Sequence, residues 1–204
     1  GEKVQDWVDG KCTGDEAIAV LDEIQQSDPE KNCFGKAEDD FDTHQCALLT
    51  GEMFLDATDA DYALISENEW KKGISSRSEN KDGVNGKLYK GDITDEQIVV
   101  FLPTGWYGTI QTVTLTGKRL RELDKTGYDR NGDGDTYPYT LVSEDGTEPE
   151  DDRKYTVAVC GATDEILEEG DVQDTGIVGL DAAKKFLKSR GTISVSMLDG
   201  KEVN

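Results

Sequence analysis

A run of oxygen-bearing side chains between residues 129 and 135 is the part of the sequence best suited to bind a metal ion. It reads Asp-Arg-Asn-Gly-Asp-Gly-Asp, and its candidate ligands are Asp129, Asn131, Asp133 and Asp135. Oxygen ligands at positions 1, 3 and 5 with glycine at position 6 match the start of an EF-hand loop, which surrounds Ca²⁺ with hard oxygen donors. Position 12 is Thr140 rather than glutamate, and Asn-Gly and Asp-Gly pairs also form plain turns. Two interpretations therefore stay open, a structural Ca²⁺ site and a solvated turn.

The rest of the sequence has few residues of the kinds that catalyse hydrolysis. Its single histidine is His44, which stands near a predicted helix start and which we interpret as a surface or capping residue. No Gly-x-Ser-x-Gly nucleophile motif is present. A hydrolytic two-metal site needs several protein ligands around its metal ions. We therefore expect this chain to have no catalytic residues and no activity on its own.

Four cysteines allow either disulfides or buried thiols. They are Cys12, Cys33, Cys46 and Cys160, and none form a Cys-x-x-Cys pair. If the chain is exported, we expect Cys12 to pair with Cys33 around an N-terminal helix, which would stabilise the fold by about 3 kcal/mol in the loop-entropy model. Cys46 and Cys160 would then form a second bridge or remain thiols. The alternative is that all four are free thiols.

Residues 91 to 123 form the unit around which the predicted fold is organised. Thr94 is a suitable N-cap and Gln97 completes a capping box with it, so a helix is expected to begin at this point. The stretch from 108 to 116 is rich in Thr, Val and Ile, which favours a strand. A second short helix is expected from 118 to 123. The unit is therefore helix, tight loop, strand, turn and helix.

Hydrophobic periodicity predicts the other elements. Helices are expected over 13–26, 46–58 and 177–189, and strands near Phe34 and over 61–65, 139–143, 155–160 and 192–197. Residues 75–90 are predicted to be an exposed hairpin or loop. Because helices and strands mix without a strict βαβ repeat, we expect an α+β fold, a mixed β-sheet with flanking helices.

Three short motifs occur in a fixed order. They are Gly91-Asp92-Ile93-Thr94, Leu102-Pro103 and Leu115-Thr116-Gly117. Together they resemble the C-terminal domain of the 5'-nucleotidase family, and the resemblance extends from about Phe34 to about Met197. It implies a linker helix over residues 1–30 and a 5'-nucleotidase C-terminal-like domain over residues 31–204.

The resemblance also implies where a nucleotide or nucleoside would bind. Family members stack the base between aromatic rings on two loops and contact the nucleotide with an arginine. The matching positions of this sequence give the candidate substrate-binding residues Lys71, Lys72, Thr104, Trp106, Tyr107 and Asp164. Trp106 and Tyr107 have the alternative interpretation of residues that pack a loop. We expect adenosine or AMP to bind weakly if at all.

The net charge of the chain disfavours negatively charged binding partners. The chain has 44 acidic and 22 basic residues and a net charge of -22, which disfavours nucleic acid and anionic lipid. No apolar run approaches the roughly 20 residues needed to span a bilayer, so we expect no membrane insertion. The acidic, Thr- and Gly-rich composition suits a secreted or cell-surface bacterial protein.

Two functions from different classes agree with these observations. The first is the C-terminal substrate-recognition domain of a secreted or cell-surface 5'-nucleotidase-like nucleotide hydrolase. Its partner would be an N-terminal metallophosphatase domain, and that domain would hold the divalent metals. The alternative is a non-catalytic structural or adhesion module of a bacterial surface protein, stabilised by Ca²⁺. The domains that accompany this chain in its parent protein would discriminate between the two.

Overall fold

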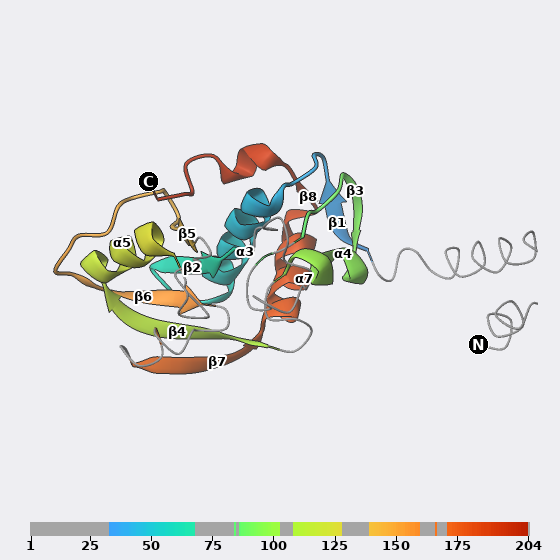
Figure 1. Ribbon diagram of the computed structural model, residues 1–204. Coiled ribbons are helices and arrows are strands. Elements are labelled where there is room, and N and C mark those ends of the chain that lie inside the picture. Colours follow the sequence, from blue (N-terminus) through green and yellow to red (C-terminus); the bar gives the residue numbers. More distant parts are fainter. Residues whose placement is uncertain are drawn as a thin grey trace, which may run out of the picture. The chain divides into compact units, whose positions relative to one another are not determined.

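Figure 1 shows the computed structural model, which describes residues 33–67, 84, 86–102, 108–127, 139–159, 166 and 171–203. From Phe34 onward the chain forms one compact unit. Its strands are β1 Cys33–Ala37, β2 Tyr62–Ser66, β3 Gly91–Thr94, β4 Thr109–Thr116, β5 Tyr139–Val142, β6 Lys154–Val159, β7 Val172–Val178 and β8 Thr192–Ile193. Its helices are α3 Thr43–Ala57, α4 Asp95–Phe101, α5 Gly117–Thr126, α7 Gly179–Arg190 and the 3₁₀ helix η1 Val195–Leu198.

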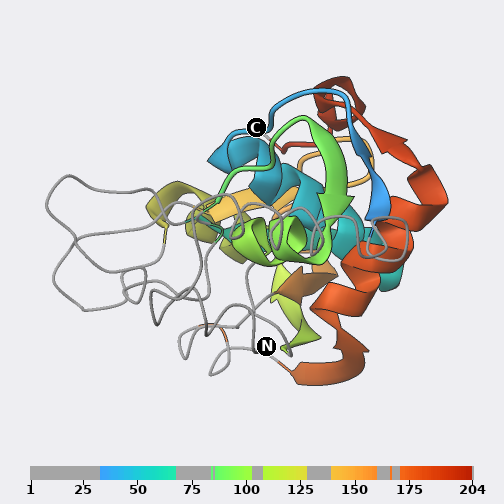
Figure 2. The same cartoon turned by 90° about the vertical axis from the view of Figure 1, so that its right-hand side faces the viewer.

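The larger sheet has five strands in the order β5-β2-β6-β4-β7. Strand β2 runs parallel to β6 and antiparallel to β5, and β4 runs antiparallel to both β6 and β7. A smaller sheet has the order β3-β1-β8, with β1 parallel to β8. In two views at right angles the smaller sheet lies beside α4 and α7 (Figures 1 and 2). The observed fold is α+β with mixed sheets and flanking helices, as predicted.

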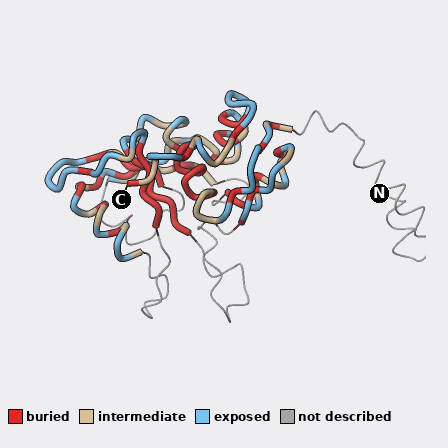
Figure 3. Tube along the Cα trace, turned by 90° about the horizontal axis from the view of Figure 1, so that it is seen from above, coloured by how far each residue is buried: buried red, intermediate tan, exposed pale blue. Residues whose placement is uncertain are grey.

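Alternating side chains of the larger sheet enter two separate cores, because successive residues of a strand point to opposite faces. On β2, Ala63 and Ile65 belong to the core that also holds α3 and α7. Tyr62 and Leu64 belong to the other core, which α5 covers with Leu120 and Leu123. Figure 3 shows the buried residues gathered in these central strands and helices, with exposed residues around them.

Helix α3 begins three residues earlier than the periodicity predicts. The Asp42 side chain accepts a hydrogen bond from the backbone N–H of Gln45 at 2.8 Å, and the Gln45 side chain accepts one from the N–H of Asp42 at 2.9 Å. This reciprocal pair is a capping box, which satisfies two N–H groups that a helix start leaves without partners. The predicted box of α4 is confirmed, and the Gln97 side chain accepts from the Thr94 N–H at 3.0 Å.

The observed secondary structure differs from the predicted one in three places. Strand β7 was not expected, and Gly176, at a φ of 70°, breaks the alternation that would have indicated it. The strand predicted over 192–197 stops at Ile193, because the N–H groups of Val195 and Met197 bond to Asp39 and Ser194 and the chain turns into η1. The segment predicted to be exposed over 75–90 contains two described residues that are fully buried, Val84 and Leu88.

Candidate functional site

Five strand ends meet at one edge of the larger sheet, which we call the loop-bearing edge. Strand β2 ends here at Ser66, which pairs with Tyr139 at the start of β5. One strand further along, β6 ends at Val159. Strand β4 starts at Thr109, which pairs with Val178 at the end of β7. The parallel strands β2 and β6 thus direct their carboxyl ends to one place, which is where open sheets commonly bind ligands.

The segments that carry the predicted site residues all join the sheet at the loop-bearing edge. Residues 68–83 follow β2, residues 103–107 precede β4, residues 128–138 precede β5, and residues 160–165 follow β6. The candidate side chains themselves lie outside the described residues: Lys71, Lys72, Thr104, Trp106, Tyr107 and Asp164 for substrate, and Asp129, Asn131, Asp133 and Asp135 for metal. The sheet therefore brings together the described strand ends that flank them.

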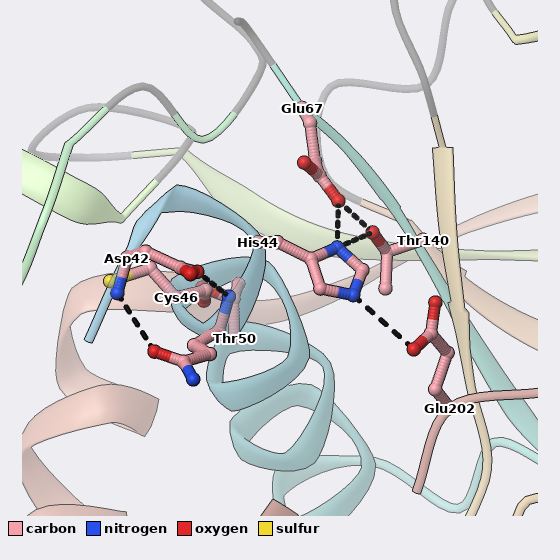
Figure 4. A network of polar contacts seen from close by, with 8 residues as sticks. Asp42, His44, Cys46, Thr50, Glu67, Thr140 and Glu202 are labelled. Atoms are coloured by element: carbon pink, nitrogen blue, oxygen red, sulfur yellow. Dashed lines mark hydrogen bonds and ion pairs between the residues drawn. The ribbon is translucent and has the colours of Figure 1, made fainter. Parts of the chain in front are cut away.

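A network of polar side chains around His44 occupies the loop-bearing edge (Figure 4). His44 lies in the first turn of α3 and donates from Nδ1 to the Glu67 Oε1 at 2.7 Å. Its Nε2 donates to the Glu202 Oε2 at 3.2 Å. Thr140 of β5 donates its hydroxyl to the same Glu67 oxygen. The Glu67 side chain is 5% exposed, whereas those of His44 and Glu202 are 44% and 38% exposed.

The geometry of this network favours a positively charged imidazole. An ionised carboxylate only accepts hydrogen bonds, so both ring nitrogens of His44 must carry protons to serve Glu67 and Glu202 together. The bond to Glu67 and the two negative charges raise the pKa of His44 to about 9, although burial acts in the opposite direction. At neutral pH, His44 is therefore an imidazolium held between two carboxylates.

The interpretation of His44 as a capping residue is wrong, whereas its side chain is indeed nearly half exposed. Asp42 caps α3, and His44 is tied into a network with Glu67, Thr140 and Glu202. None of these partners lies near it in the sequence, since they are 23, 96 and 158 residues away. Sequence patterns cannot reveal such a cluster, because local periodicity carries no information on which distant segments meet.

Comparison with known proteins identifies the architecture. No protein-family model matches the sequence, and no curated protein matches it either. Among solved structures, a 5'-nucleotidase precursor from Thermus thermophilus matches with a TM-score of 0.57 and 16% identity, over 88% of this chain and 40% of that chain. The NAD nucleotidase of Haemophilus influenzae matches with a TM-score of 0.54 and 10% identity, over 91% of this chain and 40% of that chain. The chain has the fold of one part of a 5'-nucleotidase.

The chain spans about two fifths of the length of the two structures just named, since the match covers 40% of each of them. A sulfate thiohydrolase from Thermus thermophilus shares it, with a TM-score of 0.56 and 11% identity over 88% of this chain and 37% of that chain. Proteins named for different substrates therefore have the same architecture. The fold alone does not specify a substrate, and function has to be argued from the residues at the edge.

The opposite edge of the 5'-nucleotidase fold has a cavity of about 590 Å³. Five carboxylates line it together with two basic side chains, and its charged lining includes Glu52, Asp56, Asp59, Asp61, Glu144 and Lys201. Such a lining repels phosphate, so this cavity is a poor place for a nucleotide. Among the residues that the structure describes, no group of three or more His, Cys, Asp or Glu side chains is arranged to hold a metal ion.

Cys46 lies in the first turn of α3, and its state decides between a second disulfide and a free thiol. It is a free thiol, fully buried, and its Sγ donates to the carbonyl oxygen of Phe41 at 3.8 Å. Burial raises its pKa to about 12, so the thiol stays protonated and unreactive. A second bridge between Cys46 and Cys160 is therefore wrong. The Cys12–Cys33 disulfide stays a prediction, because Cys12 lies outside the described residues.

We expect His44 to make stability depend on pH above neutrality. Its pKa rises from 6.5 to about 9 on folding, so its contribution is fully present below pH 6.5 and is lost as pH rises through about 9. Because His44 is nearly half exposed, solvent screening reduces this contribution to roughly 1 kcal/mol. Urea unfolding of the wild type and of His44→Gln should give a difference in unfolding free energy that shrinks from pH 7 to pH 10. A difference that is constant or grows over this range would contradict the charge assignment.

Proposed function

We propose that this chain is the C-terminal substrate-recognition domain of a secreted or cell-surface bacterial protein related to the 5'-nucleotidases. Its ligand would be a nucleotide or nucleoside, bound at the loop-bearing edge by Lys71 or Lys72, Thr104, Trp106, Tyr107 and Asp164. The observation that carries the proposal is the topology of the larger sheet. All four segments that hold these residues and the candidate metal ligands are anchored on neighbouring strand ends of a 5'-nucleotidase fold.

The proposal assigns catalysis to another domain. A metallophosphatase domain, N-terminal in the parent protein, would hold the divalent metals that activate water and stabilise the leaving phosphate. In the part of the chain that the structure describes, the one histidine is engaged by Glu67 and Glu202 rather than available to a metal. In the described part, no helix is long and apolar enough to cross a membrane.

We expect the purified chain to hydrolyse no nucleotide and to bind adenosine or AMP only weakly. A dissociation constant near 1 mM corresponds to about -4 kcal/mol, and one stacked aromatic face is worth about 1–3 kcal/mol. Trp106→Ala should therefore weaken binding at least about fivefold. Saturation-transfer NMR, with titration up to tens of millimolar ligand, measures this, and phosphate release reports hydrolysis.

Two variants separate recognition from general charge effects. Lys71→Gln with Lys72→Gln should weaken AMP more than adenosine, because only AMP carries a phosphate. Lys118→Gln is a matched control, since Lys118 is an exposed lysine of α5 at the opposite edge of the sheet. No binding of either compound at tens of millimolar would rule out recognition by this chain alone. Metal-dependent phosphate release by the purified chain would overturn the assignment of catalysis to another domain.

A bound Ca²⁺ in the 129–135 segment is a second part of the proposal. The ligands would be Asp129, Asn131, Asp133 and Asp135, and the ion would fix the connection that leads into β5. Thr140, at position 12 of the motif, would contribute no ligand, because its hydroxyl is engaged by Glu67. The ion would be structural and would stabilise the fold whether or not a nucleotide binds.

We expect EDTA to lower the melting temperature and millimolar Ca²⁺ to restore it. A ligand that binds only the folded state stabilises it by RT ln(1 + [L]/Kd), which is about 2.7 kcal/mol at 100 times Kd. Asp129→Ala combined with Asp133→Ala should abolish the response, whereas Asp151→Ala with Asp152→Ala, in an exposed acidic turn, should leave it intact. A melting temperature that does not change with Ca²⁺ would support the plain-turn interpretation.

A further inference from the structure

The last described residues of the chain run along β5, the outermost strand of the larger sheet, without forming a regular strand. Ser143 donates its N–H to the carbonyl of Lys201, and Val203 donates to the carbonyl of Leu141, both at 3.0 Å. Glu202 lies between them in an antiparallel bridge with Val142. We call residues 201–203 the C-terminal segment. It satisfies backbone groups that an edge strand leaves without partners.

Side chains hold this segment at three points, one of which is Val203, buried in the core that α5 covers. Lys201 pairs with Glu52 at 3.4 Å and donates to the carbonyl of Glu144 at 2.7 Å. Glu202 accepts from His44 at the loop-bearing edge (Figure 4). Two main-chain bonds alone make a short contact, so these polar contacts add to the burial of Val203 in keeping the segment in place.

His44 links the C-terminal segment to the end of β2 at the loop-bearing edge. Its other ring nitrogen bonds to Glu67, the residue that directly follows β2. Glu67 in turn accepts from Thr140 of β5, and Ser66 beside it accepts the N–H of Val84 at 2.8 Å. One half-exposed ring thus joins α3, the end of β2 and the C-terminal segment.

The charged groups that face the imidazole ring of His44 explain why this ring has to carry a positive charge. Glu67 faces it from the end of β2 and Glu202 from the C-terminal segment. Asp124 of α5 lies near Glu202, and burial together with that neighbouring charge raises the pKa of Asp124. On its own helix, the Asp42 carboxylate is occupied by the helix start, and the Cys46 thiol bonds to Phe41. Without a charge on His44, Glu67 and Glu202 would lose a shared counter-ion.

We propose that His44 is a positioning residue that couples the docking of the C-terminal segment to the order of the loop-bearing edge. The coupling runs from Glu202 through the imidazolium ring to Glu67 and the end of β2. Release of the C-terminal segment then loosens the point from which residues 68–83 leave the sheet. This inference does not depend on the proposed function, because no ligand takes part in it.

Hydrogen exchange followed by NMR tests the coupling at three amides. Val203 reports docking of the C-terminal segment, Val84 reports order at the end of β2, and Asp61, bonded to Thr156 at the opposite edge, is the internal reference. Glu202→Gln should speed exchange at Val203 and at Val84 by at least about threefold, with Asp61 unchanged. Glu202 does not contact Glu67 in the network, but the C-terminal segment also bonds to β5, which pairs with β2. The comparison with His44→Gln therefore decides whether an effect at Val84 passes through the ring.

His44→Gln should speed exchange at the same two amides, and the double variant should add little to it. Because His44 is the one histidine in the sequence, its ring signals are unambiguous, and Glu202→Gln should lower the pH at which they titrate. Glu148→Gln, an exposed carboxylate outside the network, is the matched control and should change none of these quantities. Faster exchange at Val203 alone would overturn the coupling. Equal acceleration at all three amides would show general destabilisation and would also overturn it.

Discussion

Replacing Phe54 with alanine is expected to lower the free energy of unfolding by about 3–5 kcal/mol. Phe54 is a fully buried side chain of α3, in the core that α3 shares with the larger sheet and α7. Helix α3 packs against β2, β5, β6 and α7 at once. It therefore has little freedom to collapse into the space that the ring would leave. Since domains are commonly stable by about 5–15 kcal/mol, this single change would remove a large share of the total.

Urea unfolding followed by circular dichroism measures this loss. Tyr89→Ala is the matched control, because it also removes an aromatic ring but from a residue that is 62% exposed. Its cost should stay within about 0.5 kcal/mol. If Phe54→Ala costs no more than Tyr89→Ala, with the same dependence on urea, the packing of α3 described above is incorrect.

Gly117→Ala is expected to destabilise the protein by about 3 kcal/mol, near the upper end of the cost of overpacking. A Cβ at this position would lie 2.1 Å from the backbone oxygen of Glu150 and 2.7 Å from its carbonyl carbon. The turn that contains Glu150 would have to move. It would strain the hydrogen bonds from the Gly117 N–H to Arg153 at 2.9 Å and from the Lys118 N–H to Asp151 at 3.1 Å.

The sign of this effect discriminates between two physical arguments. Helix propensity alone predicts that alanine in place of glycine stabilises a helix by about 1 kcal/mol. The structure predicts the reverse, because the clash is with backbone that cannot swing away. Gly176→Ala is a useful control, since it has open space around it and a φ of 70°. It should cost only about 1–2 kcal/mol through backbone conformation. A neutral or stabilising Gly117→Ala, measured by urea unfolding, would contradict the close approach of the turn.

Local signals in the sequence predicted several elements well. Thr94 and Gln97 form the expected capping box, and β4 and α5 follow in the expected order. Helix capping depends on residues three positions apart, so the interaction is readable from the sequence itself. The α+β class and the resemblance to a 5'-nucleotidase domain rest on such local units and their order. Both agree with the observed fold.

Elements with weak local signals were missed. Strand β7 is an edge strand with one face only partly buried, and Gly176 interrupts its pattern, so apolar and polar residues do not alternate along it. The chain after Ile193 alternates like a strand, yet it turns into η1 because Asp39, far away in the sequence, binds the N–H of Val195. In both places a tertiary contact decided the outcome against the local pattern.

The sequence by itself determined the helices and strands that have strong local signals, the order of the family-like motifs, and the types of residue available for chemistry. Only the tertiary structure decided that the described strand ends flanking four candidate segments lie at one edge of a sheet, that Gly117 has no room for a side chain, and that His44 is a charged link. The physical reason is the range of the interactions involved. Caps and periodicity act within one or two helical turns, whereas packing and ion pairs join residues such as His44 and Glu202, which are 158 positions apart.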